Sequence, residues 1–444
     1  MSDTFHHLNL TQPLLDALMD IGFTRPTPIQ EKAFPVVLSG RDVVGIAQTG
    51  TGKTFAYLLP ILRNLKFSKE KEPRVAILVP TRELVIQMVS ELEKLTKYMT
   101  VRVVGVYGGT NINTQALSVK PGVDILVGTP GRFLDLVFNR SVSLKSVKQL
   151  VIDEVDEMLN LGFRSQLNSI LDLLPKKRQN LLFSATMTEE VDDLIGVFFN
   201  GPELIEVTRM GTPLEKIRQS AYRVPNFNTK INLLIHLLQS DASMEKVLIF
   251  GPSKRMADRI YEFLEPKFPG QFSATHSNKS QNFRMQAVEK FQNGTLRGLV
   301  STDLLARGLD VTDVTHVINV DTPDVPEAYI HRIGRTGRAD TEGAAITLIA
   351  DKEVPFLEQI EALMGKSIPQ LPLPDDNLVS SVLTEEEKEA KYSGKNYLPN
   401  PTLLHSKGAF HEKKEKNKKV NLGNATKARR DAKYKKPIKK KPKK

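Results

Sequence analysis

The sequence predicts an α/β protein with two tandem domains, each a mostly parallel sheet flanked by helices, followed by a disordered basic C-terminal tail. Its 444 residues exceed the usual length of one domain. Short Val, Ile and Leu runs recur, each followed by a turn and a longer helical pattern, as parallel strands with crossover helices require. This pattern lapses near the middle and again after about residue 365. We therefore expect lobes at 1–208 and 216–368, a linker at 209–215 and an extension at 369–444.

The apolar runs give the expected strands in order. In the first lobe these strands are 43–47, 75–79, 103–106, 125–127, 150–152 and 181–183, and in the second they are 247–250, 299–301, 317–320 and 344–349. Between the two sets, Val207 to Glu215 contains the turn-forming Gly211 and Pro213, so we place the hinge there. Beyond the second set we expect a Pro-rich segment and a charged helical piece from Thr384 to Tyr392.

Composition excludes several classes of protein. The chain has no cysteine, which rules out disulfides and thiolate metal sites and fits the cytoplasm. Its apolar runs are shorter than the roughly 20 residues that cross a bilayer, so we expect no membrane span. The N-terminal segment Met1 to Leu18 lacks the basic head and apolar run of a secretory signal.

The net charge of +11 is concentrated at the C-terminal end. From Lys413 to Lys444 there are 16 Lys and Arg residues against only Glu415 and Asp431, so the preceding residues together are close to neutral. Such an arm has nothing apolar to bury and its charges repel one another, so we expect it to be disordered when free.

A phosphate-binding loop follows the first expected strand and precedes a helix. It comprises Ala47, Gln48, Thr49, Gly50, Thr51, Gly52, Lys53 and Thr54. The glycines let backbone N–H groups point into the loop, Lys53 can reach the β and γ phosphates, and the Thr54 hydroxyl can bind Mg²⁺. The strict pattern begins with Gly where this chain has Ala47. The alternative is a Gly-rich turn that only caps the helix.

An acidic cluster, Asp153-Glu-Val-Asp156, ends the expected strand at 150–152. Beside a phosphate loop, Asp153 would hold Mg²⁺, and Glu154 would orient or deprotonate the attacking water. Alone, such a cluster is more often a solvated helix start, so the interpretation depends on the loop about 100 residues earlier.

Two arginines in the second half can stabilise the charge that develops on a transferred phosphoryl group. Arg335 and Arg338 lie three residues apart, so one helical turn would bring both guanidinium groups to the same oxygens. The alternative is a basic surface turn. Combined with the first-half motifs, the arginines predict one site shared by two lobes.

These motifs together resemble those of DEAD-box RNA helicases, which have two RecA-like lobes, over roughly residues 3 to 365. Further matching elements are Gly22-Phe23 and Pro26 to Gln30 with Phe5 upstream, Pro80 to Leu84, Gly108-Gly109, Thr129 to Arg132, Ser184 to Thr186, Ser301 to Asp303 and Ala306 to Asp310. The resemblance implies an ATP-dependent RNA helicase that bends RNA on lobe closure and separates short duplexes locally.

The resemblance also implies roles for individual residues. Phe23 and Gln30 would read adenine, for which the Gln amide has both a donor and an acceptor, and Asp310 would bind the ribose. RNA phosphates and sugars would be held by Thr81, Arg82, Gly109, Thr129, Arg132, Arg284 and Thr302. The metal site would be coupled to lobe closure through Asp156, Ser184, Thr186 and His331. For the hydroxyl residues the alternative role is ordinary strand-end capping.

Two features remain outside this set. Val155 stands where the name-giving motif has Ala; we expect its extra methyl groups to pack in the interior and ATPase activity to survive. The lysine arm would tether RNA through phosphate attraction, the alternative being a solubilising tail.

Two other functions stay open. A non-catalytic RNA clamp would bind ATP without hydrolysis, and a DNA translocase could use the same lobes. The intact Glu154 and arginines argue against the first, and the Gln30 motif argues against the second. We expect a monomer and no membrane partner. The natural RNA target cannot be inferred, because every expected core contact is to the RNA backbone.

Overall fold

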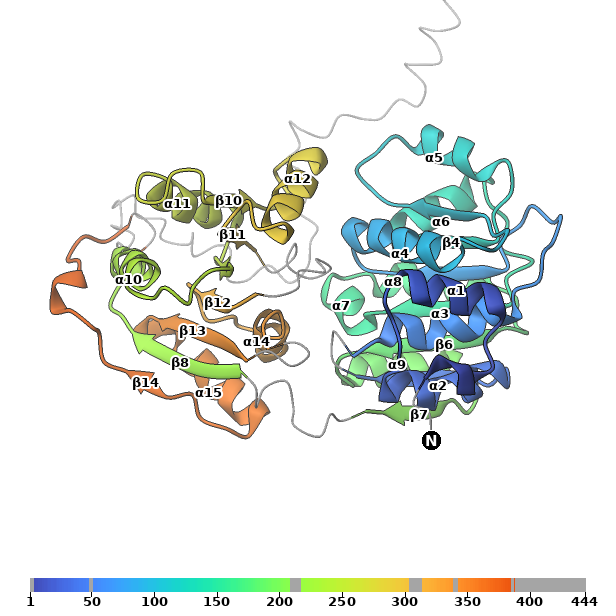
Figure 1. Cartoon of the computed structure of the whole chain (residues 1–444), viewed down its shortest axis with the longest axis horizontal. Coiled ribbons are helices and arrows are strands. Elements are labelled where there is room, and N and C mark those ends of the chain that lie inside the picture. The colour runs from blue at the N-terminus through green and yellow to red at the C-terminus, as the bar shows by residue number, and fades with distance from the viewer. Residues whose placement is uncertain are drawn as a thin grey trace, which may run out of the picture. The chain divides into compact units, whose positions relative to one another are not determined.

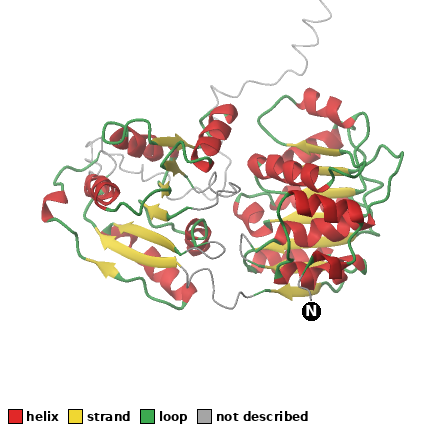
Figure 2. Ribbon diagram, viewed as in Figure 1, coloured by secondary structure: helices red, strands yellow, loops and turns green. Residues whose placement is uncertain are grey.

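The computed structural model describes residues 4–47, 51–207, 217–302, 314–337, 342–384 and 387. They form two seven-stranded sheets, each with helices on both faces (Figures 1 and 2). The expected α/β architecture of two tandem RecA-like lobes is confirmed. Within the described ranges, no helix is long and apolar enough to cross a membrane.

The first sheet has the strand order β3-β4-β2-β5-β6-β1-β7, and all its pairs are parallel. Its strands are β1 (Val43–Ile46), β2 (Val75–Leu78), β3 (Val103–Val106), β4 (Ile125–Gly128), β5 (Gln149–Asp153), β6 (Gln179–Ser184) and β7 (Glu203–Glu206). Alternate residues of each strand face opposite sides, so Val75 and Ile77 pack on one side while Ala76 and Leu78 pack on the other.

Each face of this sheet is covered by its own set of helices. One apolar cluster joins the sheet to the 3₁₀ turn η1 (Phe5–Leu8), α1 (Gln12–Asp20), α2 (Pro28–Leu38), α3 (Lys53–Asn64) and α4 (Arg82–Leu95). The opposite cluster joins it to α5 (Ile112–Val119), α6 (Pro130–Phe138), α7 (Val155–Asn160), α8 (Arg164–Leu173) and α9 (Glu189–Phe198). Covered on both faces, the central strands are apolar throughout, which is why the sequence revealed them.

The second sheet repeats the topology of the first in the order β10-β11-β9-β12-β13-β8-β14. Its strands are β8 (Ile217–Arg223), β9 (Val247–Phe250), β10 (Phe272–Thr275), β11 (Gly298–Ser301), β12 (His316–Asn319), β13 (Gly343–Ile349) and β14 (Gln370–Leu371). One face of this sheet is covered by α10 (Phe227–Ser240) and α11 (Lys254–Leu264). The other face is covered by α12 (Gln281–Gln292), α14 (Pro326–Ile333) and α15 (Val354–Met364). The 3₁₀ turn η2 (Asp351–Glu353) precedes α15.

Four strands were not predicted from the sequence: β7, β8, β10 and β14. All four lie at or next to a sheet edge. There the pattern is polar or too short, as in β7, where only Ile205 is buried, and in the two exposed residues of β14. The chain passes from the first sheet to the second between Glu206 and Ile217, and the expected hinge falls almost entirely in 208–216, outside the described residues.

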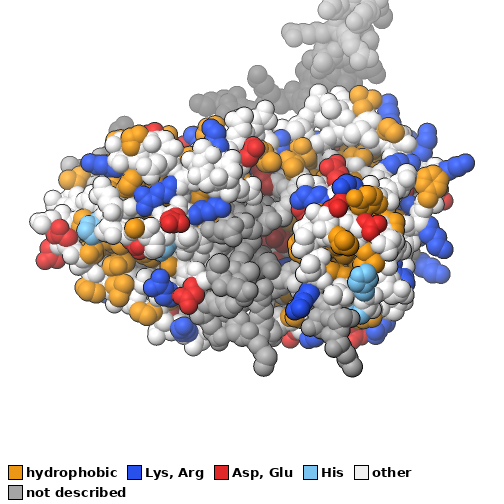
Figure 3. Space-filling model, in the orientation of Figure 1, with side chains coloured by type: hydrophobic (Ala, Val, Ile, Leu, Met, Phe, Trp, Pro, Cys, Tyr) orange, Lys and Arg blue, Asp and Glu red, His pale blue; other side chains and the backbone are white. Residues whose placement is uncertain are grey.

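The segment after residue 368 packs on the second lobe. β14 pairs with β8, and the 3₁₀ turn η3 (Asp376–Leu378) follows. The Asn232 and Asn228 side-chain amides of α10 donate to the carbonyls of Leu378 (2.9 Å) and Val382 (2.7 Å), and the Phe227 N–H donates to a Glu387 carboxylate oxygen (2.6 Å). Most of the expected charged helical piece, and the whole lysine arm, lie outside the described residues. On the surface, basic and acidic side chains are interspersed in the view of Figure 3.

A buried ion cluster fixes the amino-terminal edge of the first sheet. The Asp124 carboxylate, just before β4, accepts hydrogen bonds from Arg74 Nη2 (2.7 Å) and Arg102 Nε (2.9 Å). Although burial opposes its ionisation, these guanidinium groups hold the pKa of Asp124 below its usual value.

Replacing Asp124 by Asn should destabilise the first lobe by about 2–4 kcal/mol at neutral pH, because the two guanidinium groups lose a buried partner. Since the folded pKa is lowered, the wild-type advantage is present above the unfolded pKa near 4 and is lost as pH falls through the folded value. Urea unfolding at pH 7 and pH 3 measures both effects. The exposed Arg164–Asp193 pair (3.0 Å) provides the control, because Asp193→Asn should change stability by about 0.5 kcal/mol or less. Equal effects of both substitutions would contradict the assignment.

Candidate active site

Three adjacent strands bring the nucleotide motifs together. β6 pairs with β1 on one side and β5 on the other. Ile46 lies opposite Ser184, and Asp153 lies opposite Phe183, so the three strands end within about one residue of each other. The carboxyl ends of parallel strands form the usual binding edge of an α/β sheet. The phosphate loop, the acidic cluster and Ser184 therefore converge there.

The end of the phosphate loop is tightly packed against α2. Gly52 has φ +89°, and a Cβ at this position would lie 2.5 Å from Gln30 Nε2 and 2.8 Å from Thr27 Oγ1. Both the backbone conformation and the space therefore require glycine. α3 begins at the next residue, Lys53, which places the N-terminus of the helix at the loop.

Lys53 is the cation of this site. Its side chain is buried, and its Nζ has no hydrogen-bond partner among the described residues. Its charge acts on the carboxylates of Asp153, Glu154 and Asp156. A buried ammonium without hydrogen bonds at a helix N-terminus fits a phosphate oxygen as its partner.

The chain turns sharply after β5. Glu154 adopts the left-handed conformation, with φ 52° and ψ 50°, which is rare for a residue with a side chain and costs on the order of 1–2 kcal/mol. Its N–H donates to Asp153 Oδ1 at 2.9 Å, and α7 begins at Val155. The turn places three carboxylates at one strand end. Val155 itself is fully buried in the apolar cluster, as expected.

The carboxylates differ in their tendency to ionise. Burial raises the pKa of Asp153, against the opposing effect of Lys53. Removal from water and the charge of Asp153 raise the pKa of Glu154 to about 7, although Lys53 and Arg335 oppose this shift. A carboxyl group that titrates near neutrality is suited to accept a proton from water.

Asp156 is tied to the end of β6. Its Oδ2 accepts hydrogen bonds from the N–H groups of Ala185 (3.2 Å) and Thr186 (3.1 Å) and from the Thr186 hydroxyl (2.9 Å). Burial opposes ionisation, but His331, Lys53 and the Thr186 hydroxyl hold the pKa of Asp156 below its usual value. Ser184, the last residue of β6, is fully buried beside this group.

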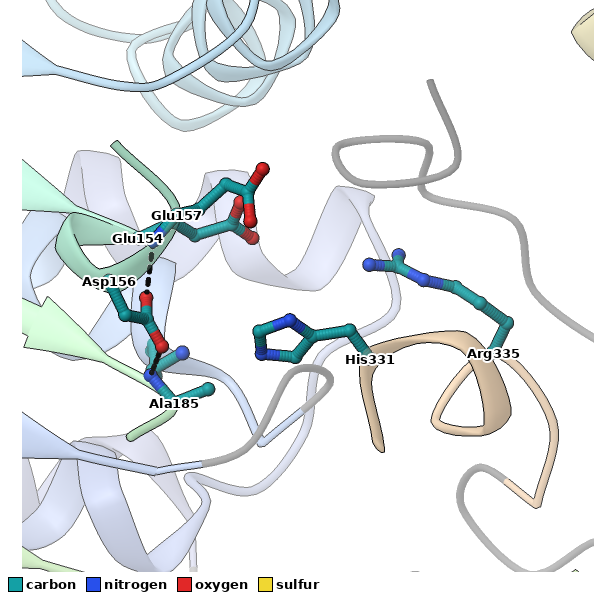
Figure 4. A pocket seen from close by; sticks show the side chains of 7 residues that line it. Glu154, Asp156, Glu157, Ala185, His331 and Arg335 are labelled. Atoms are coloured by element: carbon teal, nitrogen blue, oxygen red, sulfur yellow. Dashed lines mark hydrogen bonds between the residues drawn. The ribbon is translucent and has the colours of Figure 1, made fainter. Parts of the chain in front are cut away.

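Side chains from both lobes line one pocket. The first lobe contributes Lys53, Glu154, Asp156, Glu157 and Ala185. The second lobe contributes His331, on α14, and Arg335, in the turn that follows α14. In Figure 4 the His331 ring points toward Asp156, and the Arg335 guanidinium points toward Glu154 and Glu157. The structure therefore joins the acidic cluster to an arginine from the other sheet.

Arg332, between these two residues, has a structural role. It is buried, pairs with Asp321 at 3.1 Å and lies over the Phe250 ring at 5.1 Å. These contacts fix α14 against the second sheet, and so fix the position from which His331 and Arg335 reach the pocket.

The residues expected to read adenine lie beside the loop. The half-exposed Phe23 packs on Phe55, with 5.0 Å between ring centroids. Gln30 is buried; its Oε1 accepts from the Thr27 N–H (2.9 Å), and its Nε2 donates to the Gly52 carbonyl (3.1 Å). The Gln30 amide therefore links α2 directly to the phosphate loop. The upstream aromatic, Phe5, packs in the core.

The first-lobe residues expected to bind RNA follow three other strands of the sheet, β2, β3 and β4. Thr81 and Arg82 follow β2, Gly109 follows β3, and Thr129 and Arg132 follow β4. These strands are neighbours in the order β3-β4-β2. The five residues therefore lie along one edge of the sheet, next to the nucleotide motifs.

Their local contacts hold these groups in place. The Arg82 guanidinium lies 4.7 Å from the centroid of the Tyr107 ring. Arg132 donates to Gln115 Oε1 (2.8 Å) and to the Thr110 carbonyl (2.9 Å). The Thr81 hydroxyl accepts from the N–H of the third residue of α4 at 3.3 Å, so it also caps that helix.

In the second lobe, Arg284 lies in the first turn of α12, and Thr302 follows β11. The Arg284 guanidinium forms an ion pair with Glu83 at 2.8 Å, next to Arg82. Both partners are largely buried. The expected RNA-binding Arg284 of the second lobe is therefore held by a first-lobe carboxylate whose sequence neighbour is Arg82.

Five expected site residues, Gln48, Thr49, Gly50, Asp310 and Arg338, lie outside the described residues. Sequence reasoning missed the pocket residue Glu157, the Arg284 partner Glu83 and the Arg132 partner Gln115. Glu157 directly follows the acidic motif, and Glu83 directly follows Arg82, so proximity to a motif was the available signal for both. Gln115 had none.

The oxygen donors at the loop suit magnesium. Thr54 and Asp153 supply a hydroxyl and a carboxylate, and Mg²⁺ in nucleotide sites takes one or two such groups together with phosphates and waters. Within the described ranges, no group of three or more His, Cys, Asp or Glu side chains could hold a metal ion.

Comparison with known proteins agrees with this geometry. The DEAD/DEAH box helicase family matches residues 27–194, and the helicase conserved C-terminal domain matches residues 229–340. The chain is 40% identical over 391 residues to the ATP-dependent RNA helicase CshA of Listeria monocytogenes, covering 87% of this chain and 74% of that protein. It is 37% identical over 419 residues to the DEAD-box ATP-dependent RNA helicase CshA of Bacillus cereus, and the match covers 94% of this chain and 78% of that protein.

Solved structures show the same fold. Saccharomyces cerevisiae Dbp5 bound to RNA and ADP BeF3 superposes with a TM-score of 0.75 and 28% identity, over 84% of this chain and 96% of that one. Mss116p bound to single-stranded RNA and AMP-PNP superposes with a TM-score of 0.78 and 29% identity, over 85% of this chain and 81% of that one. With 40% identity to a relative of which it covers 74%, and a pocket built from both lobes, the chain belongs to the DEAD-box family of ATP-dependent RNA helicases.

Proposed function

We propose that this helicase hydrolyses ATP at the pocket shared by its two lobes and uses lobe closure to bend and locally unwind RNA. The observation that carries this proposal is the convergence of Lys53, Glu154 and Asp156 from one sheet with His331 and Arg335 from the other. ATP would complete the pocket, because its phosphate oxygens supply the hydrogen-bond acceptors that the buried Lys53 ammonium lacks among the described residues.

The proposed catalytic groups divide the work by chemistry. Lys53 holds the β and γ phosphates, and Glu154 accepts a proton from the attacking water. Arg335, together with Arg338, stabilises charge on the γ-phosphoryl group as it passes from ADP to water; arginines of this kind contribute about 10³-fold or more in rate. Thr54 and Asp153 would hold Mg²⁺, which when bound neutralises phosphate charge.

The nucleotide is also selected at its base and sugar. Phe23 offers an aromatic face, Gln30 offers an amide for adenine, and Asp310 would accept hydrogen bonds from the ribose. Because Gln30 already donates to Gly52, base recognition would be transmitted to the phosphate loop. Ala47 and the loop residues Gln48, Thr49, Gly50, Thr51 and Gly52 would surround the phosphates.

RNA would bind along the neighbouring strand ends. Arginine, threonine and glycine backbone groups suit phosphates and sugars, which carry no sequence information. In this proposal Thr81, Arg82, Gly109, Thr129 and Arg132 hold one part of the strand, and Arg284 and Thr302 hold the next. A strand bent between the two groups cannot stay in an A-form duplex, so short helices separate without directional travel.

Asp156, Ser184, Thr186 and His331 are proposed to couple hydrolysis to closure. The Thr186 hydroxyl and the Ala185 N–H fix Asp156 from β6, and His331 approaches it from the other lobe. Loss of the γ-phosphate would weaken the hold on Arg335 and release the lobes. We propose that Asp153-Glu-Val-Asp156 is a variant of the family motif that retains all three carboxylates.

We further propose that the protein acts as a cytoplasmic monomer, because the proposed site draws every residue from one chain. The lysine arm would add an electrostatic tether for RNA.

Replacing Lys53 by Ala or Glu154 by Gln should reduce RNA-stimulated ATP hydrolysis at least 100-fold, since each removes a group acting on the reacting phosphate or water. Steady-state phosphate release measures this. Glu154→Gln should still bind ATP, whereas Lys53→Ala should bind it more weakly. The surface variant Lys94→Ala, which breaks only an exposed pair with Glu91, is the control. Retained RNA-stimulated turnover in either site variant would contradict the assignment.

The pH dependence of turnover should follow Glu154. Because its pKa is raised to about 7, the carboxylate is mostly protonated at pH 6 and mostly ionised at pH 8. With saturating ATP, Mg²⁺ and RNA, kcat should therefore rise by up to about tenfold over this interval. The residual rate of Glu154→Gln should lack this rise. A wild-type profile as flat as that of the variant would exclude Glu154 as the base.

Deleting the residues after Phe410 should flatten the salt dependence of RNA binding and leave basal ATP hydrolysis nearly unchanged. For a single strand, the slope of log affinity against log salt falls by about 0.7 for each RNA phosphate that the protein no longer neutralises. Fluorescence anisotropy of labelled RNA measures this slope. We would use salt concentrations from about 50 to 200 mM, where electrostatic RNA binding weakens strongly. A tail of scrambled sequence should restore the slope. An unchanged slope after deletion would refute the tether.

A further inference from the structure

Tyr57 contacts both residues assigned to the proposed metal site, although none of the motifs includes it. It lies one helical turn after Thr54 on α3 and is fully buried. Its hydroxyl donates to Asp153 Oδ2 at 2.6 Å. The Thr54 hydroxyl is a second hydrogen-bonding neighbour of the Tyr57 hydroxyl oxygen. One phenolic group thus touches both side chains that we assign to magnesium.

Packing alone does not explain this hydroxyl. The Tyr57 ring packs against Phe183, with centroids 5.0 Å apart, and a phenylalanine ring would fill that space equally well. A buried hydroxyl is costly unless it is hydrogen-bonded, so its partners matter. A phenol O–H, with an ordinary pKa of about 10, is a hydrogen-bond donor at physiological pH, and the Asp153 carboxylate is its acceptor here.

The hydroxyl fixes the second oxygen of a carboxylate whose first oxygen is already held. Asp153 Oδ1 accepts from the Glu154 N–H at 2.9 Å, and Tyr57 fixes Oδ2. With both oxygens held, the plane of the carboxylate is set by the fold. If Thr54 donates to the Tyr57 oxygen, its own lone pairs stay available to a cation.

We propose that Tyr57 is a positioning residue for magnesium, orienting Asp153 and Thr54 through a hydrogen-bond chain from Thr54 to Tyr57 to Asp153. This inference rests on the magnesium site proposed above and adds a supporting residue to it. Groups that orient metal ligands in this way typically change metal affinity by about 10- to 100-fold when they are removed.

The test is Tyr57→Phe in the full chain, which removes one oxygen and keeps the ring. The measurement is the Mg²⁺ concentration that half-saturates the magnesium-dependent tightening of a fluorescent ADP analogue. We expect this concentration to rise about tenfold. Affinity for the analogue in EDTA should stay at the wild-type value, because Lys53 and the loop are untouched.

Tyr329→Phe is the matched control. Tyr329 is also fully buried, and its hydroxyl bonds to Gln219 at 3.0 Å within the second lobe. This variant should keep the wild-type Mg²⁺ requirement. A similar shift in both variants would indicate a general effect of losing a buried hydroxyl and would overturn the proposal.

The outcomes distinguish an error in the proposed magnesium site from an error in the proposed role of Tyr57. If the wild-type protein binds the analogue equally well with and without Mg²⁺, the magnesium site itself is wrong. If the wild-type protein depends on Mg²⁺ and Tyr57→Phe shows the same dependence, only the role of Tyr57 is wrong.

Should Tyr57→Phe fail to fold, 3-fluorotyrosine at position 57 keeps the hydroxyl. Its fluorine resonance should shift when Mg²⁺ is added to the ADP complex, and the same label at position 329 should not respond. An unresponsive label at position 57 would overturn the proposal.

Discussion

The register of β5, β6 and β1 is the constraint on which the active site depends. Leu181 of β6 lies opposite Val43 of β1 and Val151 of β5, so the three strands are held at one level. A slip of one residue would turn every buried side chain of a strand to the other face, which the apolar clusters on both faces prevent. The hydrophobic core therefore fixes the distance between the phosphate loop and the acidic cluster.

This fixed geometry concentrates negative charge. Asp153, Glu154 and Asp156 face a single lysine of their own lobe, and the pKa values of the first two are raised as a result of burial. A triphosphate adds more negative charge, so a stable complex needs further cations. Arg335 brings one from the other lobe, in addition to the proposed Mg²⁺. The charge balance of the pocket thus gives a physical reason why nucleotide binding and lobe association should depend on one another.

The sequence predicted the central strands and the motif positions because both leave local signals. Strands covered on two faces are continuous apolar runs, and the phosphate loop has fixed spacing between Gly52, Lys53 and Thr54. Strands at or next to a sheet edge, such as β8, contain mostly polar residues and lacked such a signal. Side-chain partnerships were also beyond reach: Tyr57 meets Asp153 across 96 positions, and Glu83 meets Arg284 across two lobes. Such contacts depend on how separate elements pack.

One sheet edge carries both functions. The ends of β3, β4 and β2 present the residues assigned to RNA, and the ends of β5, β6 and β1 present those assigned to the nucleotide. β2 and β5 are hydrogen-bonded neighbours, so the boundary between the two sites is a single strand pair. Because both sites are rigidly mounted on one edge, ATP and RNA need no deformation of the sheet to influence each other. In the proposed mechanism, each ligand would be held by both lobes, through Arg335 at one site and Arg284 at the other, and each would favour the same approach of the second lobe. Cooperative binding would then follow from two contacts that share one rigid-body movement.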